Sequence, residues 1–193
     1  VPMLVSWPTL TEEITRCQKC RLCAGRTYPV PGEGNPHARL MFIGEGPGRD
    51  EDQTGRPFVG RAGQLLDKMI GAIGLSREEV FIANVVKCRP PQNRAPEADE
   101  VAACMPYLRA QVGLIRPQVI VLLGSSALGA ILGPDHRITR ERGAWIERKG
   151  VWFMPTFHPA ALLRDESKKR PVWEDLKKVR DKLQELQADE PNA

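Results

Sequence analysis

The sequence lacks long apolar runs. Nowhere among its 193 residues do eighteen apolar residues follow one another, so no segment predicts a membrane span. The opening stretch, VPMLVSWPTL, lacks the basic and apolar regions of a secretory signal. We therefore expect a cytoplasmic protein with no membrane partner. Internal repeats and low-complexity tracts are also absent, and 41% hydrophobic residues at this length favour one domain over 1–193.

An excess of one charge is missing too, because the net charge is only +4. This value alone does not indicate a nucleic-acid partner. The basic residues are nevertheless concentrated: segment 137–150 holds five of them against two acidic residues, and three more follow at 168–170. The asymmetry fits a polyanion partner, although an ordinary solvated surface would explain the charge equally well.

The five cysteines do not form the even set that is typical of a disulfide framework. They are clustered as Cys17, Cys20 and Cys23, followed by Cys88 and Cys104. A C-x2-C pair and two distant thiolates can supply four ligands to zinc or to an iron–sulfur cluster. Zinc sites often use two tight pairs, so the wide second spacing weakly favours iron–sulfur and leaves Cys23 spare. Buried apolar cysteines are the structural alternative.

The glycine-rich stretch GEGPGRDED, at 44–52, lacks the features of a phosphate loop. No lysine followed by serine or threonine stands at the required offset, and the spacing of Gly44, Gly46 and Gly48 does not match a dinucleotide fingerprint. Four carboxylates within the stretch would repel phosphate. We therefore expect the loop to hold an uncharged group or a water molecule.

Apolar runs bounded by turn residues predict buried strands in a parallel sheet. Three such runs lie at 38–46, 81–88 and 117–126. The stretch 144–160 predicts two more strands around Lys149 and Gly150. Alternating strand and helix patterns predict an α/β sandwich with a short parallel sheet.

Helical patterns separate these strands. A capping box of Thr9 and Glu12 predicts a short helix that leads into the first cysteines. Apolar spacing predicts further helices at 61–74, 96–115 and about 171–187, and Pro106 should kink or break the second of these. The main loops are expected at 24–37 and 89–97.

Three further segments should meet the glycine loop at strand ends, where ligands bind in open α/β sheets. They carry Phe58, Asn84 and His158, the last being one of only three histidines. An aromatic ring can stack on a planar heterocycle, an amide can pair with its edge, and a histidine can stabilise charge on a carbonyl oxygen. A core ring, a turn cap and a structural histidine are the respective alternatives.

Four groups of residues resemble family 4 uracil-DNA glycosylases, the iron–sulfur branch of that superfamily in bacteria and archaea. They are GEGPGRDEDQTGRPFVGRAGQLL, NVVKCRPPQNRAP, FHPAALLR and the set Cys17, Cys20, Cys88 and Cys104. The resemblance implies a base-excision repair enzyme that flips uracil out of single- or double-stranded DNA and hydrolyses its N-glycosidic bond. It also implies a three-layer α/β sandwich with a central four-stranded parallel sheet, and we expect a monomer.

The resemblance assigns the base contacts residue by residue. Asn84 would read the O4/N3 edge of uracil, and Phe58 would stack on the ring. Backbone amides of Glu45 and Gly46 would face O2, and the loop glycines would give clearance for the flipped base. His158 would hydrogen-bond O2 and stabilise the uracil anion as it leaves.

The same resemblance assigns the cofactor and the DNA contacts. The set Cys17, Cys20, Cys88 and Cys104 would bind a 4Fe-4S cluster with a mainly structural role. Leu162 and Leu163 would form the wedge that fills the gap left in DNA. Arg164 and nearby basic residues would hold phosphates, so binding should weaken with salt.

One position departs from the better-known branches of the superfamily, which carry a water-activating aspartate or asparagine where this chain has Gly46. The residue that orients the attacking water therefore stays open between Glu45 and Glu51, with Asn93 as a weaker candidate. Only modest activation is needed, because charge develops first on the leaving base. The rival functions are a catalytically silent uracil-binding protein and a metal-containing module without a substrate.

Overall fold

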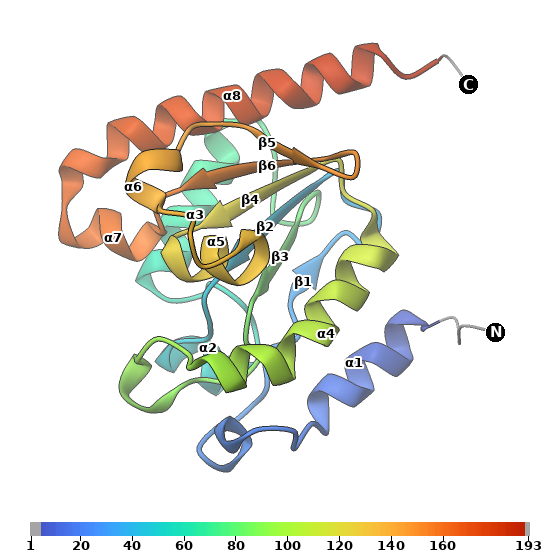
Figure 1. The fold of residues 1–193 in the computed structure, drawn as a ribbon, viewed down its shortest axis with the longest axis vertical. Coiled ribbons are helices and arrows are strands. Elements are labelled where there is room, and N and C mark those ends of the chain that lie inside the picture. Colours follow the sequence, from blue (N-terminus) through green and yellow to red (C-terminus); the bar gives the residue numbers. More distant parts are fainter. Residues whose placement is uncertain (1–4, 192–193) are drawn as a thin grey trace.

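A six-stranded sheet forms the centre of the fold in the computed structural model, which describes residues 5–191 (Figure 1). The strand order is β1-β3-β2-β4-β6-β5. Its four central strands run parallel, which confirms the predicted four-stranded parallel sheet. These strands are β2 (Leu40–Gly44), β3 (Phe81–Asn84), β4 (Val119–Leu123) and β6 (Val151–Thr156).

Two short antiparallel strands extend the sheet at its edges. β5 (Ile146–Arg148) pairs with β6 in the predicted hairpin, where Lys149 and Gly150 both have positive φ, as type I′ turns require. β1 (Glu33–Gly34) pairs with β3. The prediction of a loop over 24–37 is wrong at these two residues, because so short a strand has no alternating pattern to recognise.

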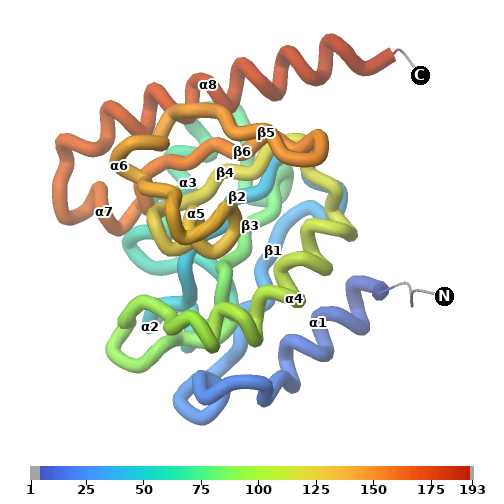
Figure 2. The backbone as a smooth tube through the Cα atoms, viewed as in Figure 1, coloured from blue at the N-terminus to red at the C-terminus, as the bar shows by residue number. Residues whose placement is uncertain are grey.

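Helices cover both faces of the sheet and make the predicted three layers (Figures 1 and 2). Alternate strand residues point to opposite faces, so Met41 and Ile43 belong to one core cluster, and Leu40 and Phe42 belong to the other. The first face carries α1 (Trp7–Thr15), α4 (Ala98–Ile115) and α5 (Ser125–Leu132). The second carries α3 (Arg61–Ala72), α7 (Pro159–Arg164) and α8 (Lys169–Ala188).

Two details of the predicted helices need correction. α1 begins at Trp7 and is capped by Ser6, whose Oγ accepts a hydrogen bond from the Thr9 amide, so the capping box predicted for Thr9 is wrong. The predicted break at Pro106 is also wrong, because α4 runs through it. Burial of residues on both sides, such as Cys104 and Leu108, compensates for the hydrogen bond that proline removes.

Several short elements escaped the periodicity analysis. A helix of one or two turns offers too few residues to show a 3.6-residue repeat. The missed elements are the helices α5, α7, α2 (Arg49–Thr54) and α6 (Ile138–Glu141), and the 3-10 turns η1 (Arg21–Ala24), η2 (Pro91–Asn93) and η3 (Glu166–Lys168). Between residues 5 and 191, none of the helices has the length and apolar character needed to cross a membrane.

Candidate active site

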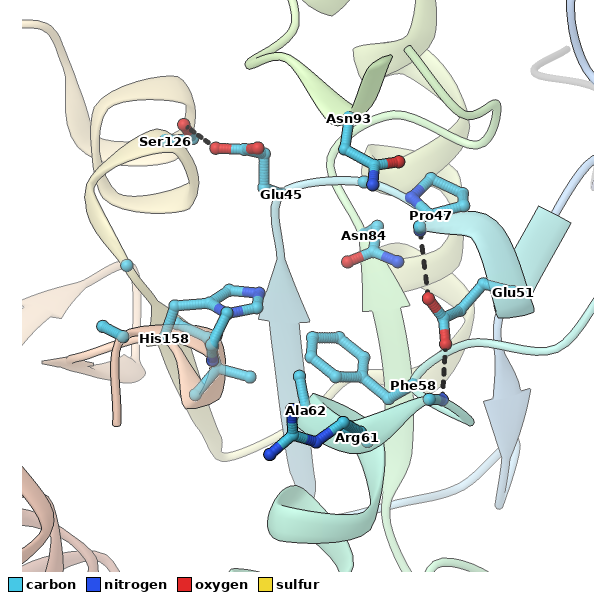
Figure 3. A pocket seen from close by; sticks show the side chains of 18 of the residues that line it. Glu45, Pro47, Glu51, Phe58, Arg61, Ala62, Asn84, Asn93, Ser126 and His158 are labelled. Carbon is cyan, nitrogen blue, oxygen red and sulfur yellow. Dashed lines mark hydrogen bonds between the residues drawn. The ribbon is translucent and has the colours of Figure 1, made fainter. Parts of the chain in front are cut away.

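A cavity of about 630 Å³ opens at the carboxyl ends of the parallel strands (Figure 3). Its walls come from the glycine loop after β2, the turn before α3, the ends of β3 and β4, and the segment after β6. All the predicted base-binding residues line this one cavity: Glu45, Gly46, Phe58, Asn84 and His158. The predicted convergence at strand ends is therefore present in the fold.

Asn84 is the last residue of β3 and is only 2% exposed. Its Oδ1 atom is buried and has no hydrogen-bond partner within residues 5–191. A buried polar atom without a partner costs about 1–3 kcal/mol, so such an atom in a cavity wall is suited to receive a ligand donor. Because Oδ1 accepts no hydrogen bond from the backbone, this atom does not cap a turn, which was the alternative role.

The glycines of the loop make room for the side chains of the site itself. Gly44 pairs with Asn84 in the parallel ladder, and a Cβ atom on Gly44 would lie 2.6 Å from both Asn84 Oδ1 and Phe58 Cζ. A Cβ atom on Gly48 would lie 2.8 Å from Glu51 Oε1. The space that the glycines leave is therefore filled by the side chains of Asn84, Phe58 and Glu51. These side chains in turn shape the space for a ligand.

Phe58 occupies a strained position in the turn before α3. Its φ is +49°, a left-handed conformation that costs a non-glycine residue about 1–3 kcal/mol. The ring is 6% exposed, and its centroid lies 5.4 Å from that of His158 at an interplanar angle of 31°. Backbone strain of this kind clusters at functional sites, so Phe58 stays a candidate for contacting a ligand while it also packs in the core.

His158 follows β6 and caps α7. Its Nδ1 accepts a hydrogen bond of 3.0 Å from the Ala160 amide, which places the proton of the neutral ring on Nε2. Burial, and to a smaller extent the positive charge of Arg164, together lower the pKa of His158 to about 4. The ring is therefore a neutral Nε2–H donor at physiological pH.

The two candidate carboxylates have different surroundings. Glu51 accepts hydrogen bonds from three backbone amides, those of Gly48 at 3.0 Å, Val59 at 2.9 Å and Gly60 at 2.7 Å. Glu45 is half-buried and accepts a hydrogen bond from the hydroxyl of Ser126 at the start of α5 (Figure 3). The weaker candidate Asn93 lines the cavity with its Oδ1 bound by Arg89 Nε at 2.7 Å.

Comparison with known proteins agrees with this geometry. The model of the uracil DNA glycosylase superfamily matches residues 31–177. The chain belongs to this superfamily. It is 49% identical to a type-4 uracil-DNA glycosylase of Thermotoga maritima, over 89% of this chain and 91% of the relative. A type-4 enzyme of Sulfurisphaera tokodaii is also 49% identical, over 89% and 82%, and a type-5 enzyme of Pyrobaculum aerophilum is 33% identical, over 83% and 77%. The resemblance to family 4 is confirmed.

Two leucines of α7 were predicted to form the DNA wedge, and only one of them is exposed. Leu163 is 40% exposed and follows the cavity residues on α7. Leu162 is 2% exposed and packs in the core between α3, α7 and the sheet. The prediction that Leu162 enters DNA is therefore wrong, because its side chain is already buried within the protein. Leu163 remains the candidate.

Several arginines line the cavity, together with the carboxylates of Glu45, Asp50 and Glu51. Arg164, predicted to bind phosphate, lines it at the end of α7. The sequence analysis missed Arg49 and Arg61, which line it at the starts of α2 and α3. It also missed Ser126, although a Gly-Ser-Ser sequence directly after a buried strand is a signal for a helix start at the strand end.

All five cysteines line a second, small cavity between α1, η1, the segment after β3 and α4. Each is a free thiol, and two accept hydrogen bonds from buried or half-buried donors: Cys88 from Arg26 Nη1 at 3.2 Å, and Cys104 from the Lys87 amide at 3.3 Å. Burial raises the pKa of the Cys104 thiol to about 11. In the described part of the chain, no three potential ligands surround a single point as one metal ion would need.

Proposed function

We propose that this chain is a uracil-DNA glycosylase that flips uracil out of DNA and hydrolyses its bond to deoxyribose, leaving an abasic site. The unpartnered, buried Oδ1 of Asn84 is the observation that carries this proposal. Uracil offers a donor at N3 and an acceptor at O4, which complement the amide oxygen and nitrogen of one asparagine. Phe58, in the same cavity wall, would stack on the ring.

The leaving base receives the electron pair of the C1′–N1 bond, and negative charge develops on O2. His158 would donate its Nε2 proton in a hydrogen bond to O2, and a neutral ring can do so without a change of charge. Glu45 and Gly46 also line this cavity, and their backbone amides would donate to the same oxygen.

Water must add to C1′ and lose a proton. Glu45 is our choice for orienting this water and accepting the proton, because its carboxylate lies at the cavity wall and is bound by one hydroxyl. Glu51 is the weaker choice, since three backbone amides already occupy its oxygens. Its role in this proposal is to hold the turns that carry Gly48 and Phe58.

Single- or double-stranded DNA is the proposed partner, bound by one copy of the chain acting as a single domain. Leu163 would enter the gap left by the flipped nucleotide, and Arg164 would hold a phosphate. Because arginines line the cavity, the affinity for DNA should fall as the salt concentration rises. We place this work in the cytoplasm, where thiols stay reduced.

A 4Fe-4S cluster bound by Cys17, Cys20, Cys88 and Cys104 belongs to the same proposal. The donor set fits, because these thiols line one cavity, and N–H groups donate to Cys88 and Cys104, which favours their thiolates. Each thiolate of such a cluster binds a different iron, so the sulfur atoms need not meet at one point. When bound, the cluster supplies a covalent tie between the start of η1, the segment after β3 and α4.

Release of free uracil from labelled single- and double-stranded DNA tests the proposal. The wild-type protein should release uracil, and Asn84→Ala should lower the single-turnover rate by about 10²–10³-fold. Asn35→Ala, which removes a surface turn contact to the His37 amide, should leave the rate unchanged. Tight retention of uracil-containing DNA without release would instead favour the silent binding protein.

A further inference from the structure

We infer that Arg77 is a positioning residue for the stacking ring, because it holds the strained turn that presents Phe58 to the cavity. The inference rests on the proposed function, in which this ring stacks on the base. Arg77 lies in the connection between α3 and β3, outside the cavity lining, and its side chain is only 15% exposed. Arg77 belongs to none of the sequence motifs named above and does not line the cavity.

The guanidinium donates to two consecutive carbonyl groups of the turn. Nη2 donates to the Pro57 oxygen at 2.7 Å, and Nη1 donates to the Phe58 oxygen at 3.0 Å. Phe58 has the positive φ that this backbone would otherwise avoid. Bonds to the carbonyl groups before and after the strained φ and ψ oppose their relaxation.

A side chain of opposite charge, that of Glu51, binds two amides of the same turn. Glu51 Oε2 accepts hydrogen bonds from the Val59 and Gly60 amides. Arg77 and Glu51 thus bind two carbonyls and two amides of one turn, which belong to three successive peptide bonds. Gly63 completes the support, because a Cβ atom there would lie 1.9 Å from the Phe58 oxygen.

Two carboxylates fix the guanidinium in this orientation. Arg77 Nη2 lies 2.6 Å from Glu33 Oε1, and Nη1 lies 2.9 Å from Asp67 Oδ1. Arg77 Nε is buried without a partner within residues 5–191, so the side chain retains a cost of burial while making these contacts. An arginine can serve two carbonyls and two carboxylates at once because its donors form a planar fork, and lysine cannot.

A purely structural role would consist of the ion pairs with Glu33 and Asp67, and the chain offers a control for the first of them. Arg56 binds the same carboxylate with two bonds of 2.9 Å, but it makes no hydrogen bond to the carbonyl groups of the Phe58 turn. Arg56→Met removes an ion pair from Glu33 and leaves the turn bonded. Arg77→Met removes the ion pairs with Glu33 and Asp67 as well as the carbonyl contacts.

A double-mutant cycle in single-turnover uracil release tests the inference. Arg77→Met should lower the rate on the order of tenfold, as expected for losing a stacked base contact. In a Phe58→Ala background the same substitution should change the rate by less than about twofold, because no ring is left to position. Arg56→Met should stay within about twofold of wild type, and Arg77→Lys should restore only part of the loss.

An equal loss from Arg77→Met with and without the Phe58 ring would overturn the inference, as would an equal loss from Arg56→Met. Far-ultraviolet circular dichroism and thermal melting show whether each variant is folded. If Arg77→Met does not fold, Arg77→Lys, which keeps the charge beside Glu33, replaces it in the same cycle. Absence of uracil release from the wild-type protein would refute the proposed function instead, so the two failures are distinguishable.

Discussion

The carboxylate of Glu45 accepts a hydrogen bond from the hydroxyl of Ser126, which joins the loop after β2 to the first turn of α5 at the cavity wall. This contact orients a carboxylate that stands between two glycines, Gly44 and Gly46. Glu45 differs in this from Glu51, whose hydrogen-bond partners are all backbone amides of neighbouring turns.

Glu45→Gln should therefore lower the rate of uracil release by about 10²–10⁴-fold, as expected for loss of a general base. Ser126→Ala should cost on the order of tenfold in the wild-type background and little when Glu45 is already Gln, since the hydroxyl acts through the carboxylate. Single-turnover rates of the two single variants and the double variant check this. A larger loss for Glu51→Gln, with an unchanged melting temperature, would transfer the role to Glu51.

His158 should titrate far below an ordinary histidine. Its pKa is lowered to about 4 by burial, so the ring stays neutral and the rate should not fall as pH drops through 6.5. A ¹H–¹³C NMR titration checks the value, and His158→Gln identifies the signal among three histidines. A His158 signal with a midpoint near 6.5 would contradict the burial argument.

The same pKa difference makes folding depend on pH with a definite sign. Between pH 6.5 and about 4 the unfolded chain binds a proton at His158 and the folded chain does not. The contribution of His158 to stability is thus complete above pH 6.5 and decreases as pH falls towards 4. Melting temperatures of wild type and His158→Gln should diverge in this window, and the variant should lose less stability than wild type on acidification.

Strand ends made much of the site predictable from the sequence. Asn84 and His158 directly follow buried apolar runs, and parallel strands bring their carboxyl ends to one edge. The choice between Glu45 and Glu51 was not predictable, because it depends on which carboxylate meets backbone amides after folding. The role of Arg77 was not predictable for a similar reason, because its partners are carbonyl groups of a turn about twenty residues earlier in the chain.

The wedge shows where local structure limited the prediction. Leu162 and Leu163 are chemically equivalent in sequence, and only the helical phase of α7 decides that the first is buried and the second exposed. α7 has six residues, too few for a helical repeat to appear. The pattern located the segment correctly and could not choose between the two leucines.

Leu163→Ala should consequently impair action on double-stranded DNA more than on single-stranded DNA. A side chain that fills the gap left by a flipped nucleotide matters mainly in a duplex, because there the neighbouring base pairs would otherwise close the gap. We expect a loss of about tenfold on a duplex and less than about twofold on a single strand, measured as single-turnover uracil release. Leu162→Ala should instead lower the melting temperature, because it opens a cavity in the core. Equal losses on both substrates would argue against the wedge.

The cysteines give a prediction that does not depend on activity. Cys104 is 8% exposed and lies on α4, whereas Cys23 lies in η1 and is the thiol left over by the proposed ligand set. Anaerobically purified Cys104→Ser should lose the visible thiolate-to-iron absorbance and most of its iron, and its melting temperature should fall because α4 is no longer tied to η1. Cys23→Ser, the matched control at the same cavity, should keep the wild-type colour and iron content. A colourless wild-type protein that carries zinc would refute the cluster, and loss of colour in Cys23→Ser would exchange the roles of two thiols.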